Sequence, residues 1–163
     1  MPNQKSVENM FSSGLQHWPQ AYKNVSPAIL RLHRVHKYLT DEFEALVSQH
    51  QLQRADFGIL SALRRSAPPY CLSPTDLYHS MLFSSGGLTK VLNRVTDAGL
   101  VERVENPEDG RSKLVRLTDA GKDLIEKAMS EVHDLEKEQL SVLSPQELDS
   151  LEQLLHKLIC RWE

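Results

Sequence analysis

Cysteine is scarce in this chain of 163 residues, which contains only Cys71 and Cys160. Two cysteines cannot form a disulfide framework, and neither stands among the ligands of a zinc site. His33 and His36 are three residues apart, but no cysteine or third histidine lies near them, so we expect no bound metal. We also expect both thiols to be inert.

Long apolar stretches are missing as well. No segment approaches the 18 consecutive apolar residues of a membrane span, and residues 1–15 hold no apolar run of signal-peptide length. The chain has no glycine-rich phosphate loop, no nucleophile elbow and no convincing cluster of carboxylates or histidines. We therefore expect a cytoplasmic protein that is not an enzyme, needs no cofactor and contacts no membrane.

Charge of one sign is not in large excess, since the formal net charge is −3. This argues against binding of polyanions by the whole surface, but it is compatible with a local basic patch. A chain of this length buries roughly 70% of its unfolded surface, so it can form a stable hydrophobic core without disulfides or bound metals. The length fits one domain, or one domain with a dimerising extension.

Residues 84–118 organise the rest of the sequence. They begin with an apolar stripe at helical spacing, formed by Leu88, Val91, Leu92, Val95 and Ala98. The other face of this predicted helix carries donors of hydrogen bonds or charge, namely Ser85, Thr89, Lys90, Asn93 and Arg94. Gly99 follows the stripe, where a left-handed cap ends a helix. A helix with such a face suits the major groove of DNA.

A two-stranded hairpin is predicted after this helix. Residues 101–105 and 113–117 read as strands, and residues 106–110 are turn formers. Arg111 and Lys113 lie near the tip, where they would reach phosphates or the minor groove. The alternative is ordinary packing of a helix beside a hairpin, in which the exposed polar residues have no function. The pattern by itself leaves both interpretations open.

A shorter helix is predicted before these elements. Residues 73–76, Ser-Pro-Thr-Asp, have the pattern of a capping box with proline at the first helical position, and the helix continues to about Met81. Two short helices joined by a tight turn and followed by a hairpin form a winged helix-turn-helix. Ser73 and Thr75, with the helix amides, would hold a phosphate. Gly86 and Gly87 either let the backbone approach DNA closely or relieve crowding between the helices.

Long amphipathic helices flank this core. They are predicted over residues 26–50, 118–140 and 144–162, whereas residues 1–17 are either a short amphipathic helix or a frayed terminus. One winged core is too small to cover the apolar stripes of the long helices. A homodimer would cover them, and packing within one chain is the alternative.

The predicted fold is mainly α with a small β-wing, a winged helix-turn-helix core with long dimerisation helices. Its regions are an N-terminal extension at 1–25, a helical dimerisation region at 26–52 and 119–163, and a DNA-binding region at 53–118.

The chain resembles the MarR family of dimeric winged-helix transcription regulators. The resemblance covers residues 26–163 and is carried by Asp109-Gly110-Arg111, by Leu114 to Thr118 with Gly121, and by Gly99 to Arg103. The wing of that family reads Asp-x-Arg, a short strand, then Leu-Thr and a glycine. The resemblance implies that Arg111 enters the minor groove and that Asp109 orients it.

Within the family, residues 63–70 and 72–75 look most like the urate-responsive PecS-like branch. That branch has a tryptophan in an N-terminal extension, matched by Trp18, and an arginine near the end of the reading helix, matched by Arg94. The position of its ligand-linked aspartate falls on Gly58, with Asp56 two residues earlier, which sets this chain apart. Trp18, Phe57 and Arg94 are the candidate contacts of a small aromatic or purine ligand.

The sequence thus predicts a homodimeric transcriptional repressor. It would bind a pseudo-palindromic operator, and a small ligand would control this binding. The predicted DNA contacts are Ser73, Thr75, Ser84, Ser85, Gly87, Thr89, Lys90, Asn93, Arg94, Asp109, Arg111, Ser112 and Lys113. Two alternatives are a regulator that responds to thiol oxidation and a winged-helix module that binds protein and not DNA.

Overall fold

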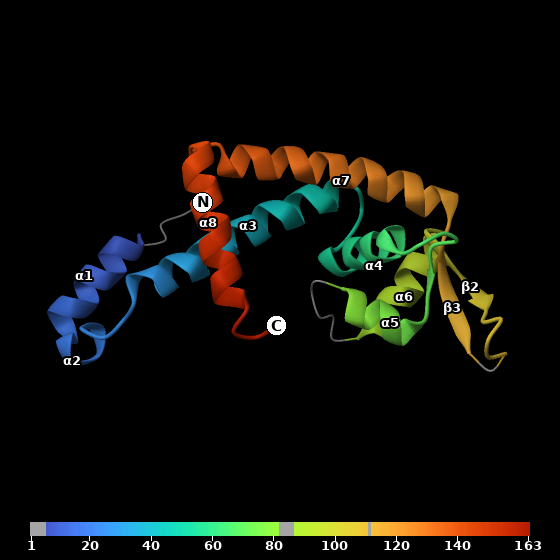
Figure 1. The fold of residues 1–163 in the computed structure, drawn as a ribbon, viewed down its shortest axis with the longest axis horizontal. Coiled ribbons are helices and arrows are strands. Elements are labelled where there is room, and N and C mark those ends of the chain that lie inside the picture. Colours follow the sequence, from blue (N-terminus) through green and yellow to red (C-terminus); the bar gives the residue numbers. More distant parts are fainter. Residues whose placement is uncertain (1–5, 82–86, 111) are drawn as a thin grey trace. The chain divides into compact units, whose positions relative to one another are not determined.

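The computed structural model describes residues 6–81, 87–110 and 112–163, which form helices and one small sheet (Figure 1). The chain divides into two compact units, Met1–Glu42 and Phe43–Glu163. The helices of the first unit are α1 (Val7–His17), α2 (Pro19–Tyr22) and most of α3 (Pro27–Gln49). The second unit contains α4 (Arg54–Arg65), β1 (Cys71–Leu72), α5 (Pro74–Ser80), α6 (Leu88–Asp97), β2 (Val101–Glu105), β3 (Lys113–Leu117), α7 (Asp119–Leu140) and α8 (Pro145–Ile159). The predicted fold class is confirmed.

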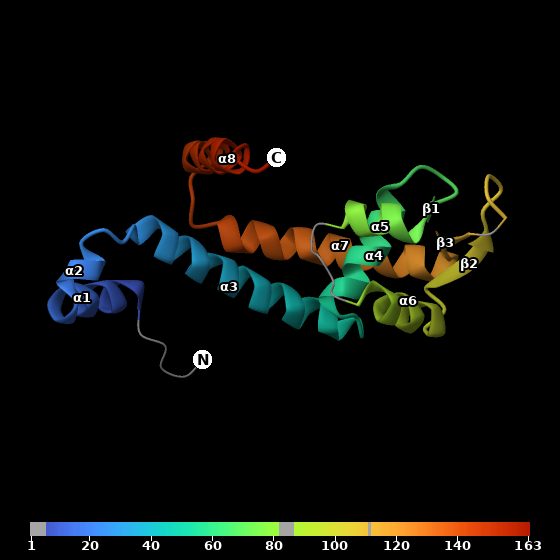
Figure 2. The same cartoon turned by 90° about the horizontal axis from the view of Figure 1, so that it is seen from below.

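Helix α4 is the centre of the second unit. All residues from Asp56 to Leu63 are buried, and α4 contacts α5, α6, α7 and β3, beside which it lies in both Figure 1 and Figure 2. The apolar side chains with almost no exposed surface include Val47, Ile59, Leu60, Leu63, Leu77, Leu92, Val95, Val101, Val115, Ile125 and Ala128. Burial of each such side chain contributes about 1.5–3 kcal/mol. This core holds α5, α6 and the strands in fixed relation.

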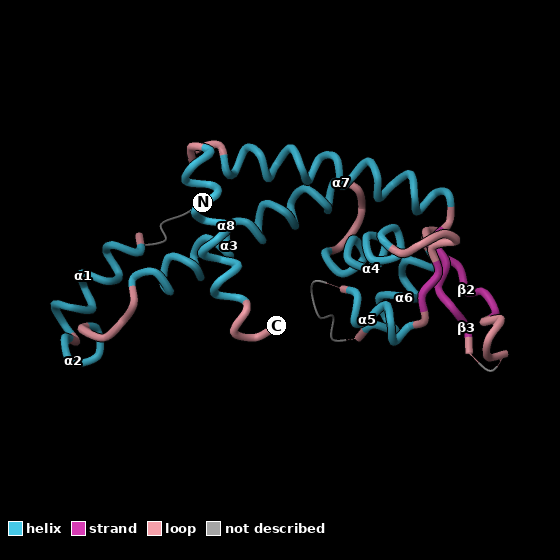
Figure 3. The backbone as a smooth tube through the Cα atoms, in the orientation of Figure 1, coloured by secondary structure: helices cyan, strands magenta, loops and turns pink. Residues whose placement is uncertain are grey.

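The sheet has the strand order β1-β3-β2 with antiparallel pairing (Figure 3). The predicted hairpin is confirmed, with Val101 opposite Leu117 at one end and Glu105 opposite Lys113 at the other. A brief third strand is also present, since Cys71 and Leu72 pair with β3. Tyr70 itself stays outside the strand, because its φ of 58° is left-handed.

Two positions next to the sheet require glycine, one for its backbone conformation and one for close backbone packing. Gly99 has a φ of 71° at the end of α6, as the sequence predicted. Gly121 lies in the first turn of α7, where an added Cβ would come within 2.1 Å of the carbonyl oxygen of Leu100. A residue that is a poor helix former is therefore required here by close backbone packing.

The helix ends follow the capping residues that the sequence offers. The Thr118 hydroxyl accepts the amide hydrogen of Gly121 at the start of α7, and Ser144 forms a capping box with Glu147 at the start of α8. Ser6 caps α1, so within the described residues the segment Val7–His17 forms the short helix that was one of the two alternatives. Helix α8 ends at Ile159 and is shorter than the predicted 144–162. Among the described helices, none has the length and apolar character to cross a bilayer.

Candidate nucleic-acid interface

Helix α6 presents one buried and one exposed face. Val91, Leu92 and Val95 pack into the core with at most 6% of their surface exposed, whereas Thr89, Lys90 and Asn93 are exposed. The predicted sidedness is correct for these six residues, but Ala98, which was assigned to the apolar stripe, is exposed. The exposed face offers an ammonium group, an amide and a hydroxyl, the groups that read base edges and phosphates.

The start of α6 differs from the prediction. The helix begins at Leu88, and Gly87 precedes it as the N-cap with a φ of 93°, so Gly87 is not part of the opening turn. An added Cβ at Gly87 would meet no described atom within 4 Å, so its backbone conformation, not crowding, favours glycine. Ser84, Ser85 and Gly86 lie outside the described residues.

Arg94 is on the inner edge of α6, where it binds a buried carboxylate. Its Nε donates to both oxygens of Asp56, at 2.9 and 3.0 Å, and a terminal nitrogen donates to Oδ1 at 2.6 Å. The Asp56 side chain is 3% exposed and that of Arg94 is 34% exposed. Asp56 also accepts the backbone amide of Gln53 at 2.8 Å, so one carboxylate joins the first turn of α4 to α6.

This contact gives Arg94 a different role from the predicted base contact. A guanidinium that reads guanine needs two parallel donors directed outward, and here three of its hydrogen bonds go to Asp56. We therefore describe Arg94 as a positioning residue of α6. No local pattern could have predicted the pair, because 38 residues separate its members.

The N-terminus of α5 is capped by its own side chains. The Ser73 hydroxyl accepts the amide hydrogen of Asp76 and donates to the carboxylate of the same residue at 2.7 Å. The predicted reach of Asp76 back to the backbone is thus replaced by a contact with the hydroxyl. Thr75 is exposed on the first turn of α5 and keeps the position predicted for a phosphate contact.

The wing turn is held by Asn106 and Ser112. The Asn106 amide donates to the Ser112 hydroxyl at 2.9 Å, and that hydroxyl donates to the carbonyl oxygen of Asp109 at 3.1 Å. Ser112 therefore stabilises the turn, a role that the prediction of a DNA contact did not include. Asp109 and Lys113 are exposed, and Arg111 lies outside the described residues.

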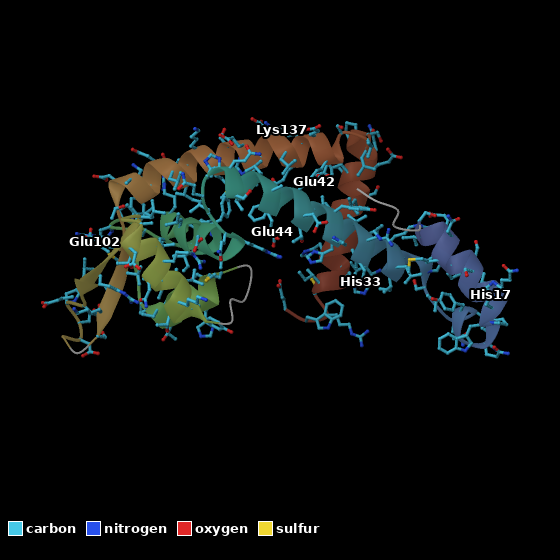
Figure 4. All side chains as sticks on the ribbon, turned by 180° about the vertical axis from the view of Figure 1, so that it is seen from behind. His17, His33, Glu42, Glu44, Glu102 and Lys137 are labelled. Atoms are coloured by element: carbon cyan, nitrogen blue, oxygen red, sulfur yellow. The ribbon has the colours of Figure 1, made fainter. Side chains whose placement is uncertain are left out.

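Opposite charges pair across the wing strands. Arg116 of β3 binds Glu102 of β2 through Nε at 2.9 Å and through a terminal nitrogen at 2.8 Å; the Glu102 side chain is labelled in Figure 4. Arg103 of β2 is exposed, although sequence reasoning did not single it out. Alternation along the strand was the signal that could have found it, since its neighbours in β2 are less exposed.

Comparison with known proteins identifies the family. A sequence model described as the MarR family matches residues 50–112. The HTH-type transcriptional regulator PecS of Dickeya dadantii is 32% identical over 127 residues, which are 78% of this chain and 76% of that protein. The multiple antibiotic resistance protein MarR of Escherichia coli is 30% identical over 139 residues, or 85% and 94% of the two chains. The chain belongs to the MarR family.

Solved structures of this family agree with the fold. A cysteine mutant of Escherichia coli MarR complexed with operator DNA superimposes with a TM-score of 0.72 at 30% identity, and the match covers 85% of this chain and 98% of that one. A putative MarR-like regulator from Bacillus cereus has a TM-score of 0.75 at 24% identity, with 83% and 96% covered, and supports the fold alone. The chain is thus related to transcriptional regulators.

The ligand residues suggested by the resemblance to PecS-like members of the MarR family lie in different settings. Trp18 belongs to the first unit and is 62% exposed, with its ring 6.4 Å from that of Tyr22. Phe57 is a core residue of the second unit, 6% exposed and edge-on to Phe43 at 5.1 Å. Arg94 is on Asp56. Phe57 therefore acts as packing in this structure, and the ligand contacts stay predictions.

The two cysteines lie in different surroundings. Burial raises the pKa of the Cys71 thiol, which disfavours its reactive thiolate. Cys160 is exposed, and its Sγ lies 3.7 Å from Nε2 of His156, one turn earlier in α8. The sequence analysis missed this neighbouring imidazole, although the four-residue spacing indicates it. Within the described residues, no three side chains among His, Cys, Asp and Glu come together as metal ligands.

Proposed function

We propose that this protein binds operator DNA as a homodimer and represses transcription. One observation carries the proposal: the exposed face of α6 offers Thr89, Lys90 and Asn93, and the opposite face is locked into the core. A solvent-facing helix of this kind fits the major groove, while the β2–β3 wing lies along the neighbouring backbone. The operator complex of the related MarR supports this interpretation.

Each donor has a role that its chemistry suggests. Asn93 suits bidentate bonding to adenine, and Lys90 suits guanine or a phosphate. Thr75 and the amides at the start of α5 would hold a phosphate, and Ser84, Ser85 and Gly87 would lie beside it. In the wing we assign Arg111 to the minor groove, as the family resemblance implies, with Asp109 orienting it and Lys113 on the backbone.

A homodimer would supply the two α6 helices that a pseudo-palindromic operator needs. Two half-sites one helical turn apart lie about 34–36 Å from each other. Apolar side chains remain exposed on α3 and α8, including Ile29 at 48%, Val35 at 51%, Leu154 at 66% and Ile159 at 46%. A second copy of the chain would cover these faces, which supports a dimerisation region at 26–52 and 119–163 and a DNA-binding region at 53–118.

A small ligand would change DNA binding by changing the position of α6. The Asp56–Arg94 pair holds α6 against α4, so a ligand that competes with Asp56 for Arg94 would change the orientation of α6. Such a ligand shifts DNA affinity only if it binds the two orientations unequally. Trp18 is exposed and offers an aromatic face to an aromatic or purine ligand.

Gel-shift titration of the full chain with the upstream region of its own gene tests DNA binding. We expect Asn93→Ala to weaken the specific complex about 5- to 100-fold and to relax specificity at one base pair. Lys90→Ala and Arg111→Ala should weaken binding and reduce the dependence of affinity on salt. Lys137→Ala is the matched control, since Lys137 is an exposed lysine of α7 paired with Asp134. Unchanged affinity in Asn93→Ala, Lys90→Ala and Arg111→Ala together would contradict the proposal.

The contact between Cys160 and His156 favours one second candidate, a regulator that responds to thiol oxidation. Peroxide oxidises exposed thiols to sulfenic acid, and Cys160 is exposed beside an imidazole. Peroxide should then lower operator affinity in the native chain and leave Cys160→Ser unaffected. A stable dimer that shows no specific DNA complex would instead favour a winged-helix module that binds protein.

A further inference from the structure

Helix α5, which precedes α6 in the helix-turn-helix, has few anchors in the core. Among its seven residues, all of which the structure describes, Leu77 is the one that is buried. The N-terminal end of α5 is fixed by the sheet, because Leu72 of β1 pairs with Val115 and Ser73 then caps the helix. A helix this short depends on tertiary contacts for its stability. A second contact at its C-terminal end is therefore needed to fix its direction.

Arg65, in the last turn of α4, makes this contact. One terminal nitrogen of its guanidinium donates to the backbone carbonyl oxygen of Ser80, the last residue of α5, at 2.8 Å. The other terminal nitrogen donates to the hydroxyl of Ser61, one turn earlier in α4, also at 2.8 Å. The carbonyl groups in the last turn of a helix have no partner within the helix, so a cationic donor stabilises the end of α5.

The guanidinium of Arg65 is itself held in place by Ser61. Ser61 is 4% exposed within α4, so its hydroxyl belongs to the packed core and not to the mobile surface. A planar guanidinium presents its donors at fixed angles, and two acceptors on two helices therefore define its position. A lysine, with one ammonium group on a flexible stem, would not hold both acceptors in this geometry. Arg65 thus sets the distance from α4 to the end of α5.

A packing contact lies next to this hydrogen bond. Met81 follows Ser80 along the chain and packs against the core. The terminal methyl group of Met81 lies 3.2 Å from the position that a Cβ would take on Gly58 of α4. Glycine is unfavourable inside a helix, and here its missing side chain leaves room for Met81. The end of α5 therefore approaches α4 closely at this point.

We propose that Arg65 is a positioning residue for DNA binding, which fixes the direction of α5 relative to α4. Helix α4 then holds both helices of the helix-turn-helix. Asp56 in its first turn binds Arg94 of α6, and Arg65 in its last turn binds the end of α5. Simultaneous contact of α5 with the DNA backbone and of α6 with the bases needs one fixed arrangement of the two helices. The effect on DNA rests on the proposed function, whereas the effect on α5 does not.

Amide hydrogen exchange of the full chain tests the contact without DNA. We expect the amides of α5 to exchange about threefold faster or more in Arg65→Gln, because the end of the helix loses its donor. Arg64→Gln is the matched control at the neighbouring residue, since the Nε of Arg64 donates to Glu126 of α7 and not to α5. Unchanged exchange of the α5 amides in Arg65→Gln, or equal acceleration in both variants, would overturn the proposal.

Gel-shift titrations with the upstream region of its own gene and with unrelated DNA of the same length separate positioning from other roles. We expect Arg65→Gln to weaken the specific complex about three- to tenfold. The non-specific complex and the dependence of affinity on salt should stay as in the native chain, because both depend on phosphate contacts. Loss of a phosphate contact would instead weaken both complexes and reduce the salt dependence, and partial unfolding would weaken both by the same factor. Either of these two outcomes would overturn the proposal.

Two further variants test the geometry of the contact. Arg65→Lys keeps the charge and lacks the two-sided guanidinium, so it should bind the specific DNA nearly as weakly as Arg65→Gln. Ser61→Ala removes one acceptor and should weaken the specific complex about twofold. Its combination with Arg65→Gln should cause no further loss, because both changes act on the same contact.

Full affinity for the specific DNA in Arg65→Lys would overturn the proposal, since a positive charge would then suffice. An additive loss in the double variant would overturn it as well, because Ser61 would then act independently of Arg65. If the native chain forms no specific DNA complex, the proposed function fails, while amide exchange still decides whether Arg65 fixes α5.

Discussion

Asp56 connects α4 to α6 through Arg94. It is a carboxylate with almost no exposed surface, and it joins the Gln53 amide of α4 to the guanidinium of Arg94. A buried charge is tolerated only when it is paired and hydrogen-bonded, as it is here. The two partners are unequal, because Arg94 keeps a third of its side chain in water.

This inequality predicts the order of two substitutions. Arg94→Gln leaves a buried carboxylate without a counterion and should lower the free energy of unfolding by about 3–5 kcal/mol. Asp56→Asn leaves the partly solvated arginine and should lower it less, by about 1–3 kcal/mol. Urea unfolding of the single and double variants measures both values. Arg116→Gln, which breaks an exposed pair with Glu102, should cost at most about 1 kcal/mol. Equal effects of Arg94→Gln and Arg116→Gln would contradict this role of Asp56.

Gly121 offers a second prediction at the residue scale. Alanine is the better helix former by about 1 kcal/mol, yet its Cβ would lie 2.1 Å from the Leu100 carbonyl oxygen. Backbone at that distance cannot move aside, so Gly121→Ala should destabilise the protein by about 1–3 kcal/mol. Gly58→Ala is the control, because its Cβ would meet the flexible end of Met81 at 3.2 Å. Thermal unfolding should show a loss for the first variant and little change or a gain for the second.

At the scale of single elements, helix ends follow from short-range chemistry. Ser6, Ser73, Thr118 and Ser144 each accept an amide hydrogen three residues ahead. The Ser73 cap was predicted from the order of residues, whereas the sequence left residues 1–17 open between a helix and a frayed terminus. The hairpin is equally local, since a turn-forming segment sets the register of β2 and β3. The hairpin and the Ser73 cap could therefore be predicted from neighbouring residues in the sequence.

The capping box of α8 makes that helix sensitive to acid. Hydrogen bonds from the Ser144 backbone amide and from its hydroxyl lower the pKa of the Glu147 carboxyl below its ordinary value of 4.5. A lowered folded-state pKa means that the carboxylate stabilises the helix above the unfolded pKa, and that this contribution is lost as the pH falls through the folded pKa. NMR titration of the Glu147 carboxyl carbon measures this pKa.

Ser144→Ala should bring the pKa of Glu147 back toward 4.5 and should speed amide exchange in the first turn of α8. The Ser73 cap of α5 serves as the internal reference, since exchange there should stay unchanged. An unaltered titration of Glu147 in Ser144→Ala would show that the capping box does not control this carboxyl.

At the scale of the whole molecule, the exposed apolar faces of α3 and α8 require an explanation. Leu154, Leu155, Leu158 and Ile159 of α8 are between 43% and 66% exposed. Apolar side chains clustered at helical spacing on an exposed helix face mark an interaction surface. The homodimer that we propose would place a second copy of the chain on this surface and cover both copies at once.

Substitution on α8 tests the homodimer. Leu158→Glu places a carboxylate in the apolar stripe and should shift the protein from dimer to monomer in sedimentation, with loss of operator binding. Gln153→Glu adds the same charge to the opposite face of α8 and should leave the dimer intact. Native protein that sediments as a monomer at micromolar concentration would contradict the proposed dimer.

The order of residues alone determined the helix boundaries to within a few residues, the hairpin, the caps and the donor face of α6. Each of these depends on neighbours at most a few positions apart, so periodicity and turn chemistry suffice. The tertiary structure decided which donors are already occupied: Arg94 is held by Asp56, and the hydroxyls of Ser73 and Ser112 are engaged within their own turns. It also decided that Gly121 must be a glycine and that Arg65 binds the end of α5. The physical reason is distance along the chain, because contacts such as Arg64–Glu126 exist only after the core has brought remote segments together.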